Sequence, residues 1–292
     1  MKILDEIEND TTSFFALLDS ILNLEVPSLI SFYTSYSSKV LYTGRDYDID
    51  QYGIMSGISY FHKSGIFVDI SGSYYSQITP GYNSTNLALG YSGYLKSKLN
   101  YALSYEHYFF NTVDEASSVN SNLNNALKAS TSIRLSVFTL GVNGTVYFGS
   151  SHPSYRLAPQ FTLHPKIKTK GLLSKFSIRP TVHFPITDEN IYNTNFRYFT
   201  ARRIINRIGK RRFYLLYNRP DSRLYDRLHN DTVQNVFTLS NVSITLPLRF
   251  NHKKWSCAAT YNLNFPIALP GEILDYAMTD YFGLSASYNI GL

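Results

Sequence analysis

Regular alternation of apolar and polar residues constrains the fold of this chain most strongly. In residues 236–265 every second residue is apolar on both sides of the turn 251–254. These apolar residues are Val242, Ile244, Leu246, Leu248 and Phe250 before the turn, and Trp255, Cys257, Ala259, Tyr261, Leu263 and Phe265 after it. A period of two places successive side chains on opposite faces of a strand. The segment therefore predicts a β-hairpin with one apolar and one polar face.

The same alternation recurs along most of the chain. It predicts about twelve strands within residues 29–292, including a less regular one near 30–43. Most of them reach the ~9–11 residues that a tilted strand needs to cross a bilayer. No run of ~18 apolar residues, the usual signal of a spanning helix, occurs in the sequence. The strand length is therefore that of a membrane β-protein.

The predicted connections alternate in length. Short ones are expected at 62–65, 95–98, 138–141, 165–171 and 251–254. Longer, more polar ones are expected at 44–51, 79–84, 112–125, 185–233 and 267–279, with a brief exception at 150–154. Outer-membrane barrels combine short periplasmic turns with longer external loops, whereas a soluble sandwich has no reason to sort its loops in this way.

Composition agrees with a membrane-facing sheet. Charged residues make up 16% of the chain, against the ~25% usual in a soluble domain. The single Cys257 excludes an intramolecular disulfide and a cysteine-rich metal site. The net charge of +6 is unevenly distributed, because the first 26 residues carry one lysine and six acids. A general nucleic-acid-binding surface is therefore not indicated.

Over residues 29–292 these features resemble the outer-membrane β-barrels of Gram-negative bacteria, in a porin-like form without a narrower family. The last twelve residues, YFGLSASYNIGL, are similar to the terminal strand that such proteins offer to the barrel assembly machinery, although they end in Leu292 rather than an aromatic residue. The resemblance implies an all-β fold, an antiparallel up-and-down transmembrane barrel of 12–14 strands in the bacterial outer membrane. It also implies contact with membrane lipid and lipopolysaccharide. A soluble β-barrel or sandwich and a mitochondrial porin are the alternatives.

Two segments depart from the strand pattern. Residues 1–28 have apolar residues at helical spacing and predict a short N-terminal helical segment, which packs at the base of the barrel or, alternatively, acts as a plug or gate. Residues 185–233 form a long basic external loop or insertion, in which 200–208 predicts a short helix ending at Gly209 or 196–217 predicts an extra hairpin. Its candidate residues for binding anionic lipid or solute are Arg202, Arg203, Lys210, Arg211 and Arg212, which flank Asn206 and Arg207.

If the apolar residues face lipid, the alternate residues face the lumen. The charged residues among them are Asp69 and Glu106 on the third and fifth strands, and Arg134, Arg156, Lys175 and Arg179 on the sixth to ninth. Acids on one wall and bases further round would create a transverse field that orients a polar solute. Alternatively, these charges pair with one another and close a narrow lumen. A twelve-strand barrel lies between the filled eight-strand and the open sixteen-strand cases, so both arrangements are possible.

The favoured function is a channel or transport pore for small polar solutes. The alternative is a closed structural or adaptor barrel that binds another envelope protein through its loops or N-terminal helix. A third hypothesis is a lipid-modifying enzyme, because the outer-membrane phospholipase resembles this chain in strand number and needs an exterior His and Ser with a supporting Asn. His107 lies on the apolar face, but no such cluster can be assigned from spacing. No catalytic residue, cofactor or metal site is predicted.

Overall fold

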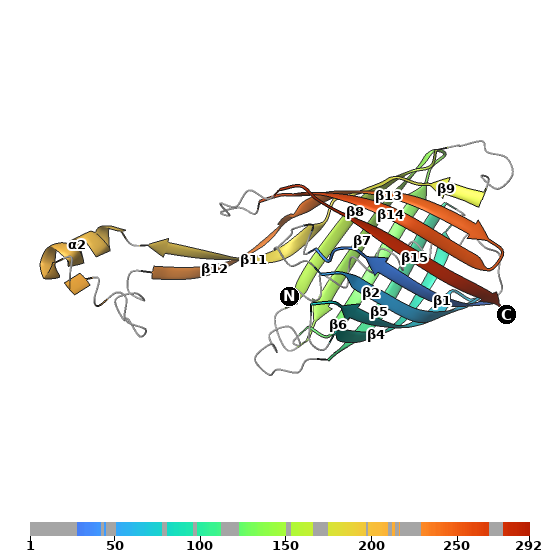
Figure 1. Cartoon of the computed structure of the whole chain (residues 1–292), viewed down its shortest axis with the longest axis horizontal. Helices are drawn as coiled ribbons and strands as arrows, with labels where there is room; N and C mark the ends of the chain where they lie inside the picture. Colours follow the sequence, from blue (N-terminus) through green and yellow to red (C-terminus); the bar gives the residue numbers. More distant parts are fainter. Residues whose placement is uncertain are drawn as a thin grey trace. The chain divides into compact units, whose positions relative to one another are not determined.

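The computed structural model describes residues 28–41, 44, 51–77, 81–95, 98–111, 123–149, 153–165, 175–196, 198–209, 212–213, 216, 229–268 and 277–292. Most of these residues belong to one antiparallel sheet, whose tilted strands are drawn in Figure 1. The strands before the helix are β1 (Ser28–Ser37), β2 (Gly53–His62), β3 (Ile66–Tyr75), β4 (Tyr82–Leu95), β5 (Leu99–Phe110), β6 (Asn125–Arg134), β7 (Phe138–Phe148), β8 (Ser154–Leu163), β9 (Phe176–Ile178), β10 (Thr181–His183) and β11 (Ile186–Phe196). The remaining elements are α2 (Tyr198–Ile208), β12 (His229–Leu239), β13 (Asn241–His252), β14 (Trp255–Pro266) and β15 (Thr279–Gly291).

The sheet closes on itself. Strands β1 to β8 pair in chain order, β13 to β15 do the same, and β15 pairs with β1 from Leu29 opposite Gly291 onwards. The remaining gap is filled by residues 176–187, here called strand nine, which comprise β9, β10 and the first two residues of β11. β10 pairs with both β8 and β13. The described residues thus form a closed barrel of twelve strands, which confirms the predicted fold.

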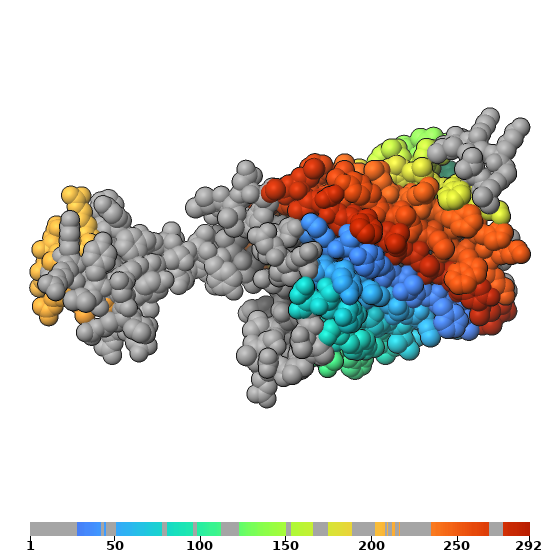
Figure 2. Space-filling model, viewed as in Figure 1, coloured from blue at the N-terminus to red at the C-terminus, as the bar shows by residue number. Residues whose placement is uncertain are grey.

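The first and last strands lie side by side on the outer surface, where Figure 2 shows the blue β1 against the red β15. The amide of Leu292 donates to the carbonyl of Ser28 at 3.0 Å. Ser28 is also the partner of His62, next to the turn between β2 and β3. Both ends of the barrel wall therefore lie at the edge that carries the short turns, as the even strand number predicts.

The outer surface consists of an aliphatic belt between two aromatic girdles. Exposed aliphatic side chains occupy the middle of the strands: Ile58, Ile70, Leu87, Leu103, Leu127, Leu246 and Leu284. Toward the long loops, the Tyr52 ring lies 5.9 Å from Tyr36 and 6.3 Å from Tyr74. Toward the short turns, the centroids of Trp255 and Tyr288 lie 4.9 Å apart. This sequence of aromatic, aliphatic and aromatic bands is the lipid-facing pattern of transmembrane barrels.

Most connections alternate in length as predicted, but the one between β8 and β9 covers residues 164–175 and is longer than the turn predicted at 165–171. The turn between β6 and β7 also lies elsewhere than predicted. The turn between β6 and β7 comprises residues 135–137, and Phe138 to Gly141, which were predicted as the turn, belong to β7. The amide of Leu135 donates to the carbonyl of Phe138 at 2.8 Å, so the turn closes three residues earlier. The hairpin between β13 and β14 is tighter than predicted, since only residues 253–254 lie between the strands and Lys253 has φ of 54°.

The segment predicted as a basic external loop contains regular structure. β11 and β12 are neighbours in the sheet and are additional to the twelve barrel strands, and α2 lies between them in the sequence. The helix ends before Gly209, whose φ of 81° suits the residue that follows a helix. The described residues within 188–238, together with residue 268, belong to a compact unit of their own. The predicted N-terminal helical segment lies outside the described residues.

Among the described residues, no helix is long and apolar enough to cross a membrane.

Candidate functional site: the barrel interior

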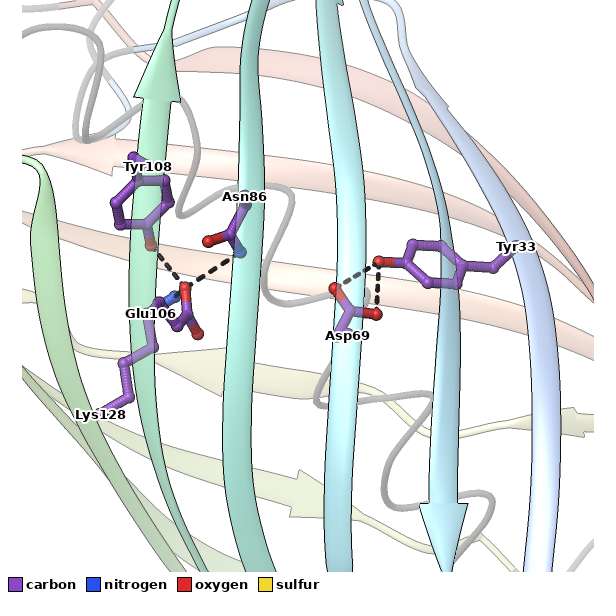
Figure 3. A network of polar contacts seen from close by, with 6 residues as sticks. All are labelled: Tyr33, Asp69, Asn86, Glu106, Tyr108 and Lys128. Atoms are coloured by element: carbon purple, nitrogen blue, oxygen red, sulfur yellow. Dashed lines mark hydrogen bonds and ion pairs between the residues drawn. The ribbon is translucent and has the colours of Figure 1, made fainter.

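Strand pairing brings the two predicted acidic residues close together. Asp69 on β3 lies opposite Ala88 on β4, and Ala88 lies opposite Glu106 on β5. Because the side chains of directly opposed residues point to the same face, all three face the lumen. Only the methyl group of Ala88 separates the two carboxylates along this row. Figure 3 shows Asp69 and Glu106 with the residues that surround them.

Glu106 is held by three side chains from three strands. The Tyr108 hydroxyl donates to its Oε2 atom at 2.6 Å, and Asn86 Nδ2 donates to the same oxygen at 3.2 Å. The Lys128 Nζ atom, on the neighbouring β6, lies 3.0 Å from it. The Glu106 and Lys128 side chains are 1% and 3% exposed. The carboxylate is therefore both charge-neutralised and hydrogen-bonded, which is what a buried charge requires.

Asp69 has its own set of hydroxyl partners. The Tyr33 hydroxyl on β1 lies 2.9 Å and 3.0 Å from its two carboxylate oxygens, and the Ser59 hydroxyl on β2 donates to one of them. Gly57 permits this contact, because a Cβ atom at that position would lie 2.6 Å from the Tyr33 hydroxyl. Each acid thus lies in its own cluster of polar contacts, on β1 to β3 for Asp69 and on β4 to β6 for Glu106.

Large side chains fill the interior beside the Asp69 and Glu106 clusters. Phe67, Tyr75, Tyr108 and Tyr147 are each 1% exposed and lie on β3, β5 and β7. A Cβ atom on Gly90 would lie 2.3 Å from the Phe67 ring, so the absence of a side chain there makes space for the ring. The half of the barrel formed by β1 to β7 is therefore packed with aromatic and ion-paired side chains.

The lumen-facing positions of the other half carry smaller side chains. On β13 to β15, alternation places hydroxyl and amide residues inward: Asn241, Ser243, Thr245, Ser256, Thr260, Asn262, Asn264, Ser285, Ser287 and Asn289. Several of these residues, such as Ser243, Thr245 and Thr260, are only partly buried. The half formed by β8, strand nine and β13 to β15 is here called the polar wall, and most of its inward residues on β13 to β15 are small and neutral.

The charged residues on the polar wall are basic. By strand register, Arg156 on β8, Arg179 in strand nine and Arg249 on β13 occupy lumen-facing positions, whereas Lys175 precedes β9. Among the described residues, no acid occupies a lumen-facing position on this wall. The Arg156 guanidinium carbon lies 5.6 Å from the centroid of the Tyr147 ring, so this residue lies where the packed half meets the polar wall.

The predicted lumen residues do not form one group. Asp69 and Glu106 lie in the packed half, whereas Arg156 and Arg179 lie on the polar wall. Arg134 is exposed at the last residue of β6, and Lys175 Nζ lies 2.7 Å from Nδ1 of His252 near the short turns. Both are therefore at the turn end of the barrel.

Lys128, the partner of Glu106, was missed from the sequence. The signal was available, because Ala126, Lys128 and Ser130 alternate with Leu127 and Ala129. The position of a charge in the alternation predicts which face it occupies but not which other strand it reaches.

The predicted basic residues of the insertion are only partly described. Of these, Arg202 and Arg203 on α2 and Arg212 are exposed, and Arg207, which was not among the predicted residues, is exposed on the same helix. Lys210 and Arg211 lie outside the described residues.

The outer face carries a histidine–asparagine pair. The Nδ1 atom of His107 lies 2.8 Å from Oδ1 of Asn125, and the Tyr105 hydroxyl donates to that same oxygen at 2.6 Å. The His107 ring packs edge-on against Phe109. Within the described part of the chain no serine hydroxyl is bonded to His107. An asparagine therefore lies beside the histidine, as the lipid-modifying-enzyme hypothesis requires, but no serine nucleophile does.

The similarity of this chain to known proteins lies in its fold. No family model and no curated protein sequence matches it. Among solved structures it is similar to the KdgM porin (9% identity, TM-score 0.46) and the NanC porin (10% identity, TM-score 0.45), with 89% of this chain and 98% of each porin covered. It is also similar to an outer-membrane channel from Pseudomonas putida F1, with 10% identity, a TM-score of 0.47, and 91% of this chain and 97% of that chain covered.

The architecture assigns the compartment. Twelve antiparallel strands close without an edge, their outer face is an aliphatic belt between aromatic girdles, and their inner face is polar. Closed antiparallel barrels with this distribution span bacterial outer membranes. The chain thus has the fold of the β-barrels of bacterial outer membranes.

Proposed function

We propose that this barrel is a channel for small polar solutes, with a preference for anions. The observation that carries the proposal is the asymmetry of the interior. Aromatic and ion-paired side chains fill the half formed by β1 to β7, and small hydroxyl and amide groups with basic residues line the polar wall. Solute would pass along the polar wall.

Both the hydration of the solute and its charge favour passage of an anion along the polar wall. Hydroxyl and amide groups can replace part of the hydration of a passing solute by donating and accepting hydrogen bonds. Basic side chains on a wall of low dielectric constant raise the local concentration of anions. Glu106 does not cancel this effect, since its charge is already compensated by Lys128 at 3.0 Å. The transverse field expected from the sequence thereby becomes a net positive potential along one wall.

Conductance of the purified protein in a planar bilayer tests the proposal. Under a KCl gradient, the reversal potential should indicate preference for chloride. The double variant Arg156→Gln with Arg179→Gln should lower the ratio of chloride to potassium permeability at least twofold. Arg202→Gln with Arg203→Gln is the matched control, because it removes the same charge from α2. A bilayer without channel events would favour the adaptor alternative, and an unchanged reversal potential in the first double variant would remove the role of the polar wall.

We also propose that the insertion binds anionic lipid headgroups. Arg202, Arg203 and Arg207 are exposed on α2, and the guanidinium group forms paired hydrogen bonds with phosphate. Lipopolysaccharide phosphates at the outer leaflet are the natural partner. This binding is compatible with the channel as well as with an adaptor.

A further inference from the structure

Proline is concentrated at one place in the barrel wall. Proline cannot donate a ladder hydrogen bond and is normally confined to strand ends, edges and bulges. Apart from the last residue of β14, the described barrel strands contain Pro159 in β8, Pro180 and Pro185 in strand nine, and Pro247 in β13. Strand nine lies between β8 and β13, so all four prolines belong to three adjacent strands.

Two of these prolines weaken the ladder between β8 and strand nine. The amide of Leu163 donates to the carbonyl of Pro180, and the amide of Phe184 donates to the carbonyl of Pro159, both at 2.9 Å. In an antiparallel pair the amide and carbonyl of one residue point to the same neighbour. The donors missing from Pro159 and Pro180 are therefore both missing from this ladder.

The other two weaken the ladder between strand nine and β13. β9 and β10 pair with β13 in one continuous register, which places Arg179 opposite Pro247. Along strand nine, the backbone groups of successive residues point alternately to β8 and to β13. Those of Pro180 and Phe184 point to β8, so those of Arg179 point to β13. The amide hydrogen that Pro247 lacks would therefore have pointed at Arg179. The carbonyl of Pro185 accepts from Ser240 at 3.0 Å, so its missing donor also belongs to the β13 side.

The regular pairing around strand nine is correspondingly short. β10 pairs over three residues with β8 and over three with β13, residues 186–187 pair with β8, and β9 pairs over three residues with β13. By contrast, β13 and β14 pair without interruption from Asn241 to His252. Within the described residues, strand nine is thus the part of the wall with the fewest ladder hydrogen bonds.

The two faces of strand nine differ in chemistry. Alternation directs Phe176, Ile178, Val182 and Phe184 outward to the lipid, and directs Ser177, Arg179, Thr181 and His183 inward to the polar wall. A molecule with an acyl chain and an anionic headgroup matches this pair of faces. Its chain would remain beside the phenylalanines while its headgroup reached the arginine and hydroxyl groups.

We propose that strand nine is a lateral gate through which an anionic acyl lipid exchanges between the bilayer and the lumen. The gate opens when strand nine separates from β8, where fewer residues are paired than between any other two neighbouring strands of the described barrel. The inward basic residues then receive the headgroup. This function differs from axial solute passage, which does not require the wall to open.

A disulfide across the gate provides the test. Thr162 and Thr181 are directly opposed, and their hydroxyl oxygens lie 3.0 Å apart, so Thr162→Cys with Thr181→Cys can join β8 to strand nine. Thr34→Cys with Ser56→Cys is the matched control on β1 and β2, where the opposed hydroxyl oxygens lie 2.9 Å apart. Both pairs are placed in a Cys257→Ser background, since Cys257 is a free thiol.

The probe is phosphatidylglycerol with a photoreactive diazirine on its headgroup, incorporated in proteoliposomes. Irradiation of the reduced protein should label inward residues such as Ser285 and Thr260, and oxidation of the gate pair should lower this labelling at least tenfold. Oxidation of the control pair should leave it unchanged. Absence of inward labelling, or labelling that survives oxidation of the gate pair, would overturn the proposal. Potassium chloride conductance, recorded in parallel, should persist in both oxidised variants and so tests the channel separately.

Hydrogen–deuterium exchange of the unmodified protein in lipid nanodiscs gives an independent measurement. Amides of residues 181–183 should exchange at least tenfold faster than those of residues 55–60 in β2. Equal protection of the two segments would contradict a gate at strand nine.

Discussion

The Glu106 carboxylate and the Lys128 ammonium group lie 3.0 Å apart inside the barrel, and less than a twentieth of either side chain is exposed. They come from adjacent strands, β5 and β6, where Ala126 rather than Lys128 stands directly opposite Glu106. The pair is therefore diagonal, and the alanine leaves room for the lysine to reach across. The same pair fills the packed half and removes a negative charge from the lumen.

Removing one partner of this pair should destabilise the barrel strongly. Lys128→Met leaves the Glu106 charge buried and without its cation, which typically costs about 3–5 kcal/mol. Urea unfolding in detergent micelles, followed by Trp255 fluorescence, measures the change. The double variant Glu106→Gln with Lys128→Met should recover more than half of the loss, because it leaves no unpaired charge. Equal stability of the single and double variants would show that the ion pair contributes nothing beyond packing.

Gly57→Ala should disturb the contact between Tyr33 and Asp69. A Cβ atom at this position would lie 2.6 Å from the Tyr33 hydroxyl and 2.7 Å from the carbonyl of Ile70. Overpacking of this kind typically costs about 1–3 kcal/mol. Gly144→Ala is the control in β7, since its Cβ atom would meet no atom closer than 3.9 Å. The two variants are compared by the same urea unfolding, and a Gly57→Ala protein as stable as Gly144→Ala would refute the close approach.

Replacement of Arg202, Arg203 and Arg207 by glutamine should weaken binding to vesicles that contain lipopolysaccharide. These side chains are exposed on α2, so their attraction to phosphate is electrostatic and screened by salt. Vesicle flotation at low and high salt measures it, using protein held in a detergent-free nanodisc. The wild-type protein should lose binding as salt rises, and the variant should bind weakly at both salt concentrations. Salt-independent binding of the wild type would exclude the proposed headgroup contact.

Much of the barrel could be predicted from local sequence, because a period of two fixes the face of every residue in a strand. The hairpin 241–266 and the inward orientation of Asp69 and Glu106 follow from that rule alone. The turn between β6 and β7 was misplaced because Leu135 and Val137 continue the apolar alternation, so the pattern does not mark where pairing stops. Turn geometry depends instead on the hydrogen bond between Leu135 and Phe138.

The candidate site was predictable only in part. Alternation assigns Lys128 to the lumen, but its bond to Glu106 depends on the register between β5 and β6, which hydrophobic pattern does not specify to a single residue. The division into a packed half and a polar wall depends likewise on which strands become neighbours after closure. The sparse pairing of strand nine could not be predicted from the sequence, because it depends on the register of this strand against both β8 and β13.

Quenching of the single tryptophan by brominated lipid tests the central claim most directly, namely that the outer apolar face contacts acyl chains. Trp255 is 53% exposed on the outer face, next to the turn at 253–254 and 4.9 Å from Tyr288. In proteoliposomes, lipid brominated on the acyl chain near the headgroup should quench its emission strongly, more so than lipid brominated near the chain terminus, while aqueous acrylamide should quench it weakly. Strong quenching by acrylamide together with no effect of either brominated lipid would contradict the account.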